Sequence, residues 1–526
     1  MVEFRMRTTA LTLTLALALE AQPSSKQAQV DQLFAAFNTH TPGCAVGVAQ
    51  NGTTALTAGY GMADLERNVP ITPGTIFESG SVAKQFTAAA LMLLAQQGKI
   101  SLDDPMSKYL PELTVPFTIR QVLSHVSGIR EWRPIATFGG TPEGTHVYTN
   151  QDLLRMAAQQ RALNFDPGTN YSYTNTGFNI STILIERVTG KTFPQYTEEQ
   201  IFKPLVMTHT RWRDDFRKII PNRALAYEVG PDGMLTQQTP IENIIGAGGL
   251  LTTVGDLLKW NENFTHAKVG GPDFVKAQQT PATLSTGRKI TYAAGLSVTD
   301  DEVSHSGATG GYRTWLGRYP KQAVSVAVLC NSAQANPTAL GRETARLWTG
   351  VPAPARPVST YSPSNLRALT GMYRRLRDNT ATDINLKDGN LIFGENTDLI
   401  PAALNQFRAG EAVYAFEANR LRVTNPTDDV LYEKVEPAQP TSQELSTLAG
   451  NYSSTETGST ITVLATDKLA YRLGVDAPVP LKPTFRDTFV TSTGASFHFL
   501  KDSAGKLTAL SIGEDRVWDL RFTRVQ

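Results

Sequence analysis

The stretch Phe77-Glu-Ser-Gly-Ser-Val-Ala-Lys-Gln-Phe86 places a serine, Ser81, three residues before a lysine, Lys84. The residues that follow are rich in Ala and Leu, which favour a helix, and Gly98 is a suitable C-terminal stop. Residues i and i+3 share one face of a helix, so the hydroxyl and the amine can meet. Free N–H groups and the dipole at the helix N-terminus would stabilise an oxyanion there. The stretch therefore predicts an activated serine nucleophile.

A Ser-x-x-Lys pattern alone is a weak signal, because it arises by chance in a chain of 526 residues. A second copy, Ser503-Ala-Gly-Lys506, contains a glycine and is interpreted as a surface turn. The first copy therefore needs support from other parts of the chain.

The composition is that of a folded protein with several domains. The length predicts roughly two to four domains, and 41% hydrophobic with 18% charged residues can build large cores. There are 49 Lys and Arg residues against 48 Asp and Glu, a net charge of +1, so neither nucleic acid nor an anionic membrane is expected as a partner.

The N-terminus has the three parts of a secretory signal peptide. Arg5 and Arg7 precede a short apolar run at residues 8–19, and Ala21 stands before a polar break. The run is too short to span a bilayer, and no other long apolar run follows. We expect residues 1–21 to be removed on export, leaving a periplasmic or extracellular protein without membrane insertion. The alternative is a frayed amphipathic N-terminus.

Residues 28–355 mix strand and helix patterns, which predicts an α+β domain. Strands are expected at 44–50 and 54–60, joined by the hairpin turn Asn51-Gly52, and at 303–306, 312–319 and 323–330. Helices are expected at 27–37, 150–158, 176–188, 254–263 and 338–348, and the Gly/Pro-rich residues 130–149 are expected to form a loop near a site.

After a Pro-rich linker at residues 352–357 the chain changes to short strands, and it repeats itself once. Leu366, Leu369, Gly371 and Tyr373 correspond to Leu445, Leu448, Gly450 and Tyr452, Phe407-Arg408 to Phe485-Arg486, and Tyr432 and Val435 to Phe522 and Val525. These matched offsets predict two copies of one small antiparallel β-barrel, at residues 360–437 and 440–526.

Two further stretches supply chemistry that a serine nucleophile needs. In Tyr173-Thr-Asn175, the tyrosine can be held as a phenolate or can relay the serine proton, and Asn175 can hold a substrate carbonyl or orient the lysine. In His305-Ser-Gly307, the histidine could orient the tyrosine or contact a substrate anion, and the glycine permits close approach of a ligand. The non-catalytic alternatives are a tyrosine that only packs in the core, an asparagine that caps a helix and a histidine that only packs.

Backbone groups complete the expected site. The Ala308 N–H could pair with the Ser81 N–H as an oxyanion hole. Residues 123–129, Leu-Ser-His-Val-Ser-Gly-Ile, are interpreted as structural, and Gly246-Ala-Gly-Gly249 as a tight turn near the site. The chain has no His-Glu-x-x-His motif, no Gly-x-Ser-x-Gly elbow and no clustered His/Cys set, so we expect no metal or cofactor.

Ser81-Val-Ala-Lys84, Tyr173-Thr-Asn175 and His305-Ser-Gly307 resemble the three ordered motifs of the serine β-lactamase and penicillin-binding protein superfamily. The branch they match best holds class C β-lactamases, D-aminopeptidases, DD-carboxypeptidases and family VIII esterases, and the resemblance covers residues 28–355. The doubled C-terminal unit is similar to D-aminopeptidases, which carry two eight-stranded barrels. The resemblance implies an acyl-enzyme on Ser81, with Lys84 and Tyr173 moving its proton.

His305 stands where typical β-lactamases have a lysine, and a histidine there resembles D-aminopeptidases and several esterases. The resemblance therefore implies a peptidase or amidase acting on small D-residue peptides. The alternatives are a family VIII-type esterase with weak or no β-lactamase activity, and a non-catalytic sensor of peptidoglycan or β-lactams. We expect a small peptide, amide or ester as the substrate and leave a homodimer possible. A barrel loop is expected to reach the cleft and narrow substrate choice; otherwise the barrels only stabilise or dock.

The two cysteines, Cys44 and Cys330, are by default buried free thiols. In the family fold the first and last strands of the catalytic sheet are antiparallel neighbours, and Cys44 opens the first while Cys330 closes the last. The resemblance therefore leaves a disulfide open in an exported protein.

Overall fold

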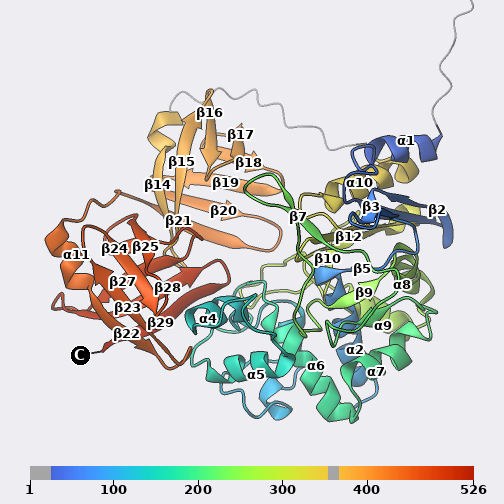
Figure 1. The fold of residues 1–526 in the computed structure, drawn as a ribbon, viewed down its shortest axis with the longest axis horizontal. Helices are drawn as coiled ribbons and strands as arrows, with labels where there is room; N and C mark the ends of the chain where they lie inside the picture. The colour runs from blue at the N-terminus through green and yellow to red at the C-terminus, as the bar shows by residue number, and fades with distance from the viewer. Residues whose placement is uncertain (1–24, 353–365, 526) are drawn as a thin grey trace, which may run out of the picture.

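The computed structural model describes residues 25–352 and 366–525, so the predicted signal peptide at 1–21 lies outside the described part. Figure 1 shows a mixed helix-and-sheet domain beside two barrels, coloured orange and red, that form the C-terminal part of the chain. The predicted fold class, an α+β domain followed by two antiparallel barrels, is confirmed. No helix within the two described ranges is long and apolar enough to cross a membrane.

The first domain is built on a six-stranded sheet with the strand order β10-β11-β12-β13-β1-β2. The Asn51-Gly52 hairpin is present, and both residues have positive φ, 51° and 76°, as a tight two-residue hairpin turn requires. The strands of this sheet are β1 (Cys44–Gln50), β2 (Thr53–Tyr60), β10 (Ser297–Val298), β11 (Val303–Thr309), β12 (Tyr312–Tyr319) and β13 (Val324–Cys330).

Helices cover both faces of this sheet. On one face, side chains such as Phe34 and Trp315 form a core beneath α1 and α10. On the other, a larger core around Phe86 and Trp260 joins the sheet to α2, α6 and α8. The helices are α1 (Lys26–Leu33), α2 (Lys84–Gln96), α3 (Ile119–Leu123), α4 (Trp132–Phe138), α5 (Asn150–Gln159), α6 (Thr176–Thr189), α7 (Phe193–Thr197), α8 (Val254–His266), α9 (Gly271–Gln278) and α10 (Pro337–Thr349).

Short strands outside the main sheet complete this domain. A three-stranded sheet has the order β5-β9-β6, and two small hairpins pair β3 with β4 and β7 with β8. Their bounds are β3 (Met62–Asp64), β4 (Val69–Pro70), β5 (Phe77–Glu78), β6 (Arg211–Trp212), β7 (Tyr227–Val229), β8 (Leu235–Gln237) and β9 (Leu250–Thr252). The β5-β9-β6 sheet matters most for function, because β5 leads directly into Ser81.

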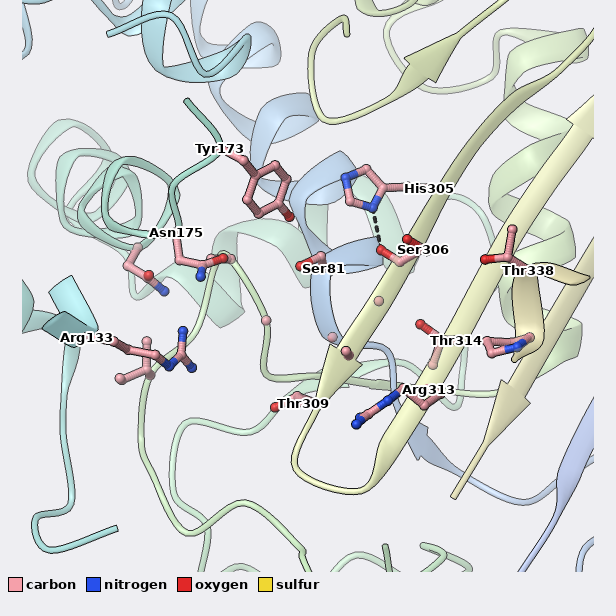
Figure 2. A pocket seen from close by; sticks show the side chains of 18 of the residues that line it. Ser81, Arg133, Tyr173, Asn175, His305, Ser306, Thr309, Arg313, Thr314 and Thr338 are labelled. Atoms are coloured by element: carbon pink, nitrogen blue, oxygen red, sulfur yellow. Dashed lines mark hydrogen bonds between the residues drawn. The ribbon is translucent and has the colours of Figure 1, made fainter. Parts of the chain in front are cut away.

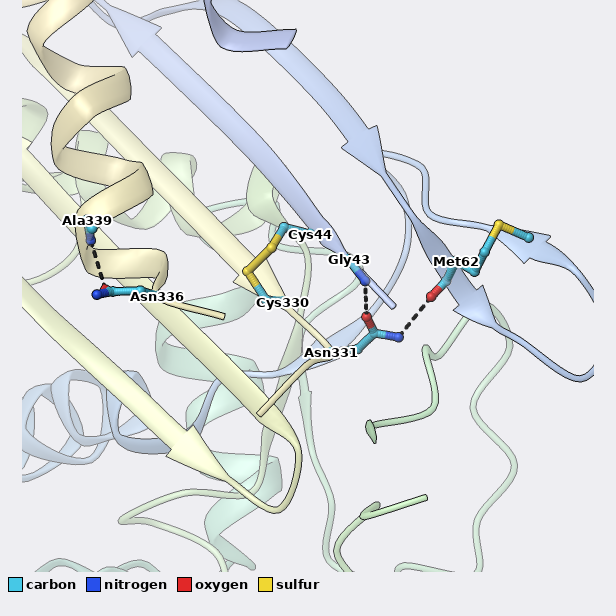
Figure 3. The surroundings of a disulfide bond; sticks show 7 residues. All are labelled: Gly43, Cys44, Met62, Cys330, Asn331, Asn336 and Ala339. Atoms are coloured by element: carbon cyan, nitrogen blue, oxygen red, sulfur yellow. Dashed lines mark hydrogen bonds between the residues drawn. A yellow bond between two sulfur atoms is a disulfide. The ribbon is translucent and has the colours of Figure 1, made fainter. Parts of the chain in front are cut away.

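Cys44 and Cys330 form a disulfide between neighbouring strands (Figure 3). Strands β1 and β13 pair antiparallel with the two cysteines opposite each other, their Cα atoms 4.0 Å apart. Next to the bridge, the side chain of Asn331 accepts a hydrogen bond from the Gly43 N–H (2.7 Å) and donates one to the Met62 carbonyl (3.0 Å). The default of two free thiols is therefore wrong, since the sheet places both at one register position.

Replacing both cysteines with serine should lower the free energy of unfolding by about 2–5 kcal/mol, because the bridge closes a long loop and restricts the unfolded chain. The two residues are 286 positions apart in the sequence. Urea unfolding of the wild type with and without reductant, beside the double variant, measures the effect. Equal stability of the oxidised and reduced wild type would contradict the prediction.

The barrels are both closed, and each has eight strands in sequence order. The first runs from β14 to β21 and the second from β22 to β29, preceded by α11 (Ser442–Leu448). Their strands are β14 (Gly371–Arg375), β15 (Ala381–Lys387), β16 (Asn390–Phe393), β17 (Thr397–Ala403), β18 (Gln406–Ala409), β19 (Ala412–Glu417), β20 (Arg420–Thr424), β21 (Asp429–Val435), β22 (Gly450–Ser454), β23 (Ser459–Ala465), β24 (Leu469–Leu473), β25 (Val479–Pro483), β26 (Thr488–Val490), β27 (Ser496–Lys501), β28 (Leu507–Glu514) and β29 (Val517–Val525).

The repeated Leu-x-Gly-x-Tyr pattern makes the same contact in both barrels. The hydroxyl of Tyr373 donates to the carbonyl of Leu369 (3.0 Å), and that of Tyr452 to the carbonyl of Leu448 (2.7 Å). The proposed match of Phe407-Arg408 with Phe485-Arg486 is wrong, because the first pair lies in β18 while the second lies in the turn between β25 and β26.

The second barrel docks on helix α4, which Figure 1 shows at the border between the barrel and the helical domain. Arg130 forms a buried ion pair with Glu456 (2.5 and 2.7 Å), and Phe138 belongs to the hydrophobic core of the barrel. The prediction of a loop at residues 130–149 is thus wrong over α4. Phe138 gains its partners from a distant part of the chain, which local sequence cannot show.

Candidate active site

Ser81 lies in a single 3₁₀ turn, Gly80–Ala83, that continues directly into α2 at Lys84. The side chain of Lys84 is fully buried, and its Nζ lies 3.0 Å from Ser81 Oγ. It also lies 2.8 Å from Asn175 Oδ1 and 2.9 Å from the carbonyl oxygen of Ala247. The predicted meeting of hydroxyl and amine is therefore present.

The protonation state of Lys84 follows from these partners. Burial lowers its pKa well below the ordinary value, with Arg516 and Arg133 acting in the same direction, while Glu131 raises it. A neutral amine has two N–H donors and one lone pair. The two carbonyl-type oxygens accept the N–H groups, and the lone pair is left to accept the hydroxyl proton of Ser81. Lys84 is thus placed as the general base for the nucleophile.

The Tyr173 hydroxyl points toward Ser81 (Figure 2), and no described residue forms a completed hydrogen bond with it. Burial raises the pKa of Tyr173, while Ser81 and Arg516 lower it by less. The side chain is therefore a neutral phenol at neutral pH. The sequence predicted two possible roles for Tyr173. A neutral phenol can relay a proton, but it does not fit the role of a phenolate held in the resting enzyme.

Asn175 links the lysine to a buried carboxylate that the sequence did not reveal. Its Oδ1 accepts from Lys84, while its Nδ2 and backbone N–H donate to Glu131 (3.1 and 2.6 Å). These contacts orient Lys84, which is one of the two roles predicted for Asn175. One Nδ2 hydrogen remains for a substrate carbonyl, the other predicted role.

His305 lines the cleft but forms no hydrogen bond with Tyr173. Its Nε2 is 2.9 Å from the Tyr292 hydroxyl, its Nδ1 is 2.5 Å from the Ser306 carbonyl oxygen, and its ring centroid is 6.3 Å from that of Tyr173. Burial, and then the nearby Lys84 amine, lower its pKa to about 4. His305 is therefore neutral near pH 7, which argues against the predicted role as a cation for a substrate anion.

The backbone of Gly80 and Ser81 lies directly against Gly307 and Ala308. A Cβ atom on Gly307 would lie 2.9 Å from the Ser81 nitrogen, and one on Gly80 would lie 2.6 Å from the Ala308 nitrogen. Only glycine permits this approach at both positions. The Ser81 and Ala308 N–H groups are thereby brought to the same small region, the arrangement that the predicted oxyanion hole needs.

Residues 123–129, predicted to be structural, and residues 246–249, predicted to form a tight turn, lie beneath this site. His125, within residues 123–129, is buried with its ring centroid 4.2 Å from that of Tyr173, so it packs against the relay residue. Gly246 and Gly249 have φ of 101° and 77°, and the turn they form presents the carbonyl of Ala247 to Lys84. This turn needs backbone angles that side chains disfavour.

A cleft of about 770 Å³ opens over Ser81 and is lined by residues from both ends of the chain. The charged side chains on its wall are Arg133, Glu242, Arg313 and Arg516. None of the four gave a recognisable sequence signal. Arg516 comes from the second barrel, so the expectation that a barrel loop reaches the cleft is confirmed.

Comparison with known protein families identifies the family to which the chain belongs. The model of the family described as Beta-lactamase matches residues 30–349, more than half of the sequence. The chain belongs to the beta-lactamase family. This match covers the domain that carries Ser81, Lys84, Tyr173 and His305.

Individual relatives in the beta-lactamase family narrow the comparison. A D-aminopeptidase of Gluconobacter oxydans (strain 621H) is 32% identical over 303 residues, which are 56% of this chain and 56% of that protein. A D-aminopeptidase of Cereibacter sphaeroides is 27% identical over 475 residues, 86% of this chain and 89% of that protein. The octameric penicillin-binding protein homologue from Pyrococcus abyssi has a TM-score of 0.58 at 23% identity, covers 77% of this chain and 99% of its own, and shares the fold.

Membership of the beta-lactamase family and the arrangement of the site agree on the chemistry. The protein is a serine hydrolase. Among the described residues, no group of three or more His, Cys, Asp and Glu side chains could hold a metal ion.

Proposed function

We propose that the protein is a D-aminopeptidase, which removes an N-terminal D-residue from small peptides and amides through an acyl-enzyme on Ser81. The observation that carries the hydrolase chemistry is the fully buried Lys84 amine, whose pKa burial lowers well below its ordinary value, held 3.0 Å from the Ser81 hydroxyl. The similarity to D-aminopeptidases over 86% of the chain supports the choice of substrate.

Acylation follows from the positions of the three side chains. Ser81 Oγ attacks the substrate carbonyl carbon while its proton passes to Lys84 Nζ. The N–H groups of Ser81 and Ala308 stabilise the oxyanion. The Tyr173 phenol then protonates the leaving amine and recovers a proton from the lysine, so the C–N bond breaks and the acyl group stays on Ser81. In deacylation a water molecule attacks the ester, and the same groups move its proton to Ser81 Oγ.

Glu242 supplies the charge that an aminopeptidase substrate needs. It is the only carboxylate among the described residues that line the cleft. Arg213, which lies 4.0 Å from Glu242, donates instead to Glu78 (2.8 and 3.1 Å), and Arg133 is paired with Glu143 and Glu131. The Glu242 carboxylate is therefore free to bind the α-ammonium group of the substrate, a group that an ester of a simple acid lacks.

The affinity for amine substrates should depend on pH through Glu242. Burial raises the pKa of this carboxyl to about 7, so it is neutral below that pH and ionised above it. The KM for D-alanine p-nitroanilide should therefore fall as the pH rises through about 7, until the substrate amine loses its proton at roughly pH 8. Steady-state kinetics across this range measures the profile.

Glu242→Gln is the matched variant, since it keeps the shape and removes the charge. It should raise KM and flatten the acidic limb, while N-acetylated substrates should show no such limb with either protein. A Glu242→Gln profile identical to that of the wild type would contradict the assignment.

A substrate panel tests the proposed function itself. D-Alanine p-nitroanilide should be cleaved in preference to its L-enantiomer, to short p-nitrophenyl esters and to the β-lactam nitrocefin. Rapid cleavage of esters with no turnover of D-aminoacyl amides would replace the proposal with an esterase, and binding without turnover of any member would replace it with a sensor.

We further propose that the protein is exported. The disulfide between Cys44 and Cys330 supports this, because such bonds persist in oxidising compartments. Fractionation of expressing cells, followed by N-terminal sequencing, would detect a mature chain that starts near Gln22. Accumulation of the full-length protein in the cytoplasm would reject it.

A further inference from the structure

Arg516 brings a positive charge from the second barrel to the catalytic residues. It lies in the turn between β28 and β29, and its side chain lines the same cleft as Ser81. The guanidinium carbon is 4.9 Å from the centre of the Tyr173 ring. A guanidinium stacked on an aromatic face keeps its edge N–H groups available for a ligand.

The turn that carries Arg516 is fixed to the catalytic domain through its backbone. The Arg516 carbonyl accepts hydrogen bonds from the Asn164 side chain (2.9 Å) and from the Glu131 N–H (3.4 Å). Asn164 also accepts from the N–H of Trp518 (3.0 Å), whose ring packs on Phe165 with centroids 5.0 Å apart. The position of Arg516 is therefore set by a docked interface and not by a free loop.

The side chain of Arg516 differs from the other arginines of the cleft. Arg133 is paired with Glu143 (2.7 and 3.2 Å) and Glu131 (3.4 Å), and Arg313 donates to two backbone carbonyls. Within residues 25–352 and 366–525, the Arg516 side chain has no carboxylate partner and donates no hydrogen bond to any other acceptor. A half-buried guanidinium without an anion is costly unless a ligand supplies one.

The balance of charge in the cleft points to the same kind of ligand. Arg133 is paired with Glu143 and Glu131, which leaves the guanidinium groups of Arg313 and Arg516 facing one carboxylate of the cleft wall, Glu242. A cleft of this balance favours an anionic group on the substrate.

We propose that Arg516 binds a carboxylate group of the substrate, so that the enzyme prefers short D-peptides with a free carboxylate near the scissile bond. This inference rests on the proposed D-aminopeptidase function and specifies it further. Arg516 is then a specificity-determining residue contributed by the barrel, while bond cleavage stays with the groups around Ser81.

The test compares substrates that differ only in one carboxylate. On the leaving-group side these are D-alanyl-D-alanine and D-alanyl-D-alaninamide, which share the bond to be cleaved. On the acyl side they are the α-p-nitroanilides of D-glutamate and D-glutamine. Each pair is measured with the wild type, Arg516→Ala, Arg516→Lys and Arg521→Ala. Arg521 is an exposed arginine of the same barrel, outside the cleft, and serves as the control.

For the wild type, kcat/KM should be about 10- to 100-fold higher for the carboxylate member of one pair, as expected for hydrogen bonds to a charged group. That pair identifies the position of the carboxylate. Arg516→Ala should bring the ratio close to one, Arg516→Lys should retain part of it, and Arg521→Ala should leave it unchanged. Thermal unfolding of each variant shows whether it is folded.

An Arg516→Ala protein that keeps the wild-type ratio in both pairs would overturn the assignment. So would an Arg313→Ala protein that loses the ratio while Arg516→Ala retains it. Calorimetric binding of the two alanine dipeptides to the Ser81→Ala protein makes the same comparison without turnover. If the wild type cleaves no D-aminoacyl amide but still binds the carboxylate member more tightly through Arg516, the proposed function fails and the subsite stands.

Discussion

Replacing Ser81 with alanine should abolish turnover of every substrate that the protein cleaves. Among the described residues, the Ser81 hydroxyl is the only nucleophile that Lys84 Nζ contacts, at 3.0 Å, and without it no acyl-enzyme can form. Loss of a catalytic nucleophile lowers kcat by roughly six orders of magnitude in a well-studied serine protease. Steady-state rates, and the mass of the intact protein after incubation with a slowly released ester, should both report the loss.

The chain offers a matched control in its second Ser-x-x-Lys pattern. Ser503 and Lys506 lie in the turn between β27 and β28, where Gly505 has a φ of 79°. Ser503→Ala should retain wild-type rates and the wild-type acyl adduct. Turnover by Ser81→Ala within tenfold of the wild type would sink the assignment of the nucleophile.

Replacing Tyr173 with phenylalanine should lower kcat by about 10²–10⁴-fold on amide substrates, the usual cost of losing a positioned proton donor. The effect should be smaller for p-nitrophenyl esters, because p-nitrophenolate leaves without needing a proton. KM should change little, since the phenylalanine ring preserves the contacts with His125 and Arg516. Comparing kcat for an amide and an ester of the same acyl group isolates the relay.

Tyr171→Phe is the control for this prediction. Tyr171 is a buried tyrosine two residues away that packs on His125, and it does not line the cleft. Its phenylalanine variant should keep both activities. Equal losses for amides and esters in Tyr173→Phe would contradict the relay and would leave a structural role.

The sequence could predict those parts of the site that lie in short, ordered motifs. Ser81 and Lys84 depend on one helical turn, and Asn175 stands at the start of a helix, so local patterns reveal them. Glu131 and Arg516 depend on contacts between segments far apart in the chain. The Glu131 side chain meets Asn175 through tertiary packing, and Arg516 reaches Tyr173 only because a whole barrel docks on α4.

The same distinction explains the errors. The charge of His305 was predicted from the ordinary pKa of the residue, but burial among the rings of Tyr292 and Tyr173 keeps it neutral. Helix α4 was predicted as a loop because its stretch is rich in Gly and Pro, although Phe138 packs in the core of the barrel and Trp132 and Ala136 pack within the catalytic domain. The match of Phe407 with Phe485 failed because similar residue pairs recur by chance among short strands.

The pairing of β1 with β13 also bears on how the domain folds. The two strands are neighbours in the middle of the sheet, yet Cys44 and Cys330 are 286 positions apart. During synthesis β1 has only the hairpin partner β2 until almost the entire domain has emerged, and an isolated hairpin is marginally stable in water. Contacts of such long range slow folding, because the entropy of closing the long loop is lost before the strand pairing stabilises the chain. Refolding of the catalytic domain should therefore be limited by the arrival of β13, which makes the active site a late product of folding.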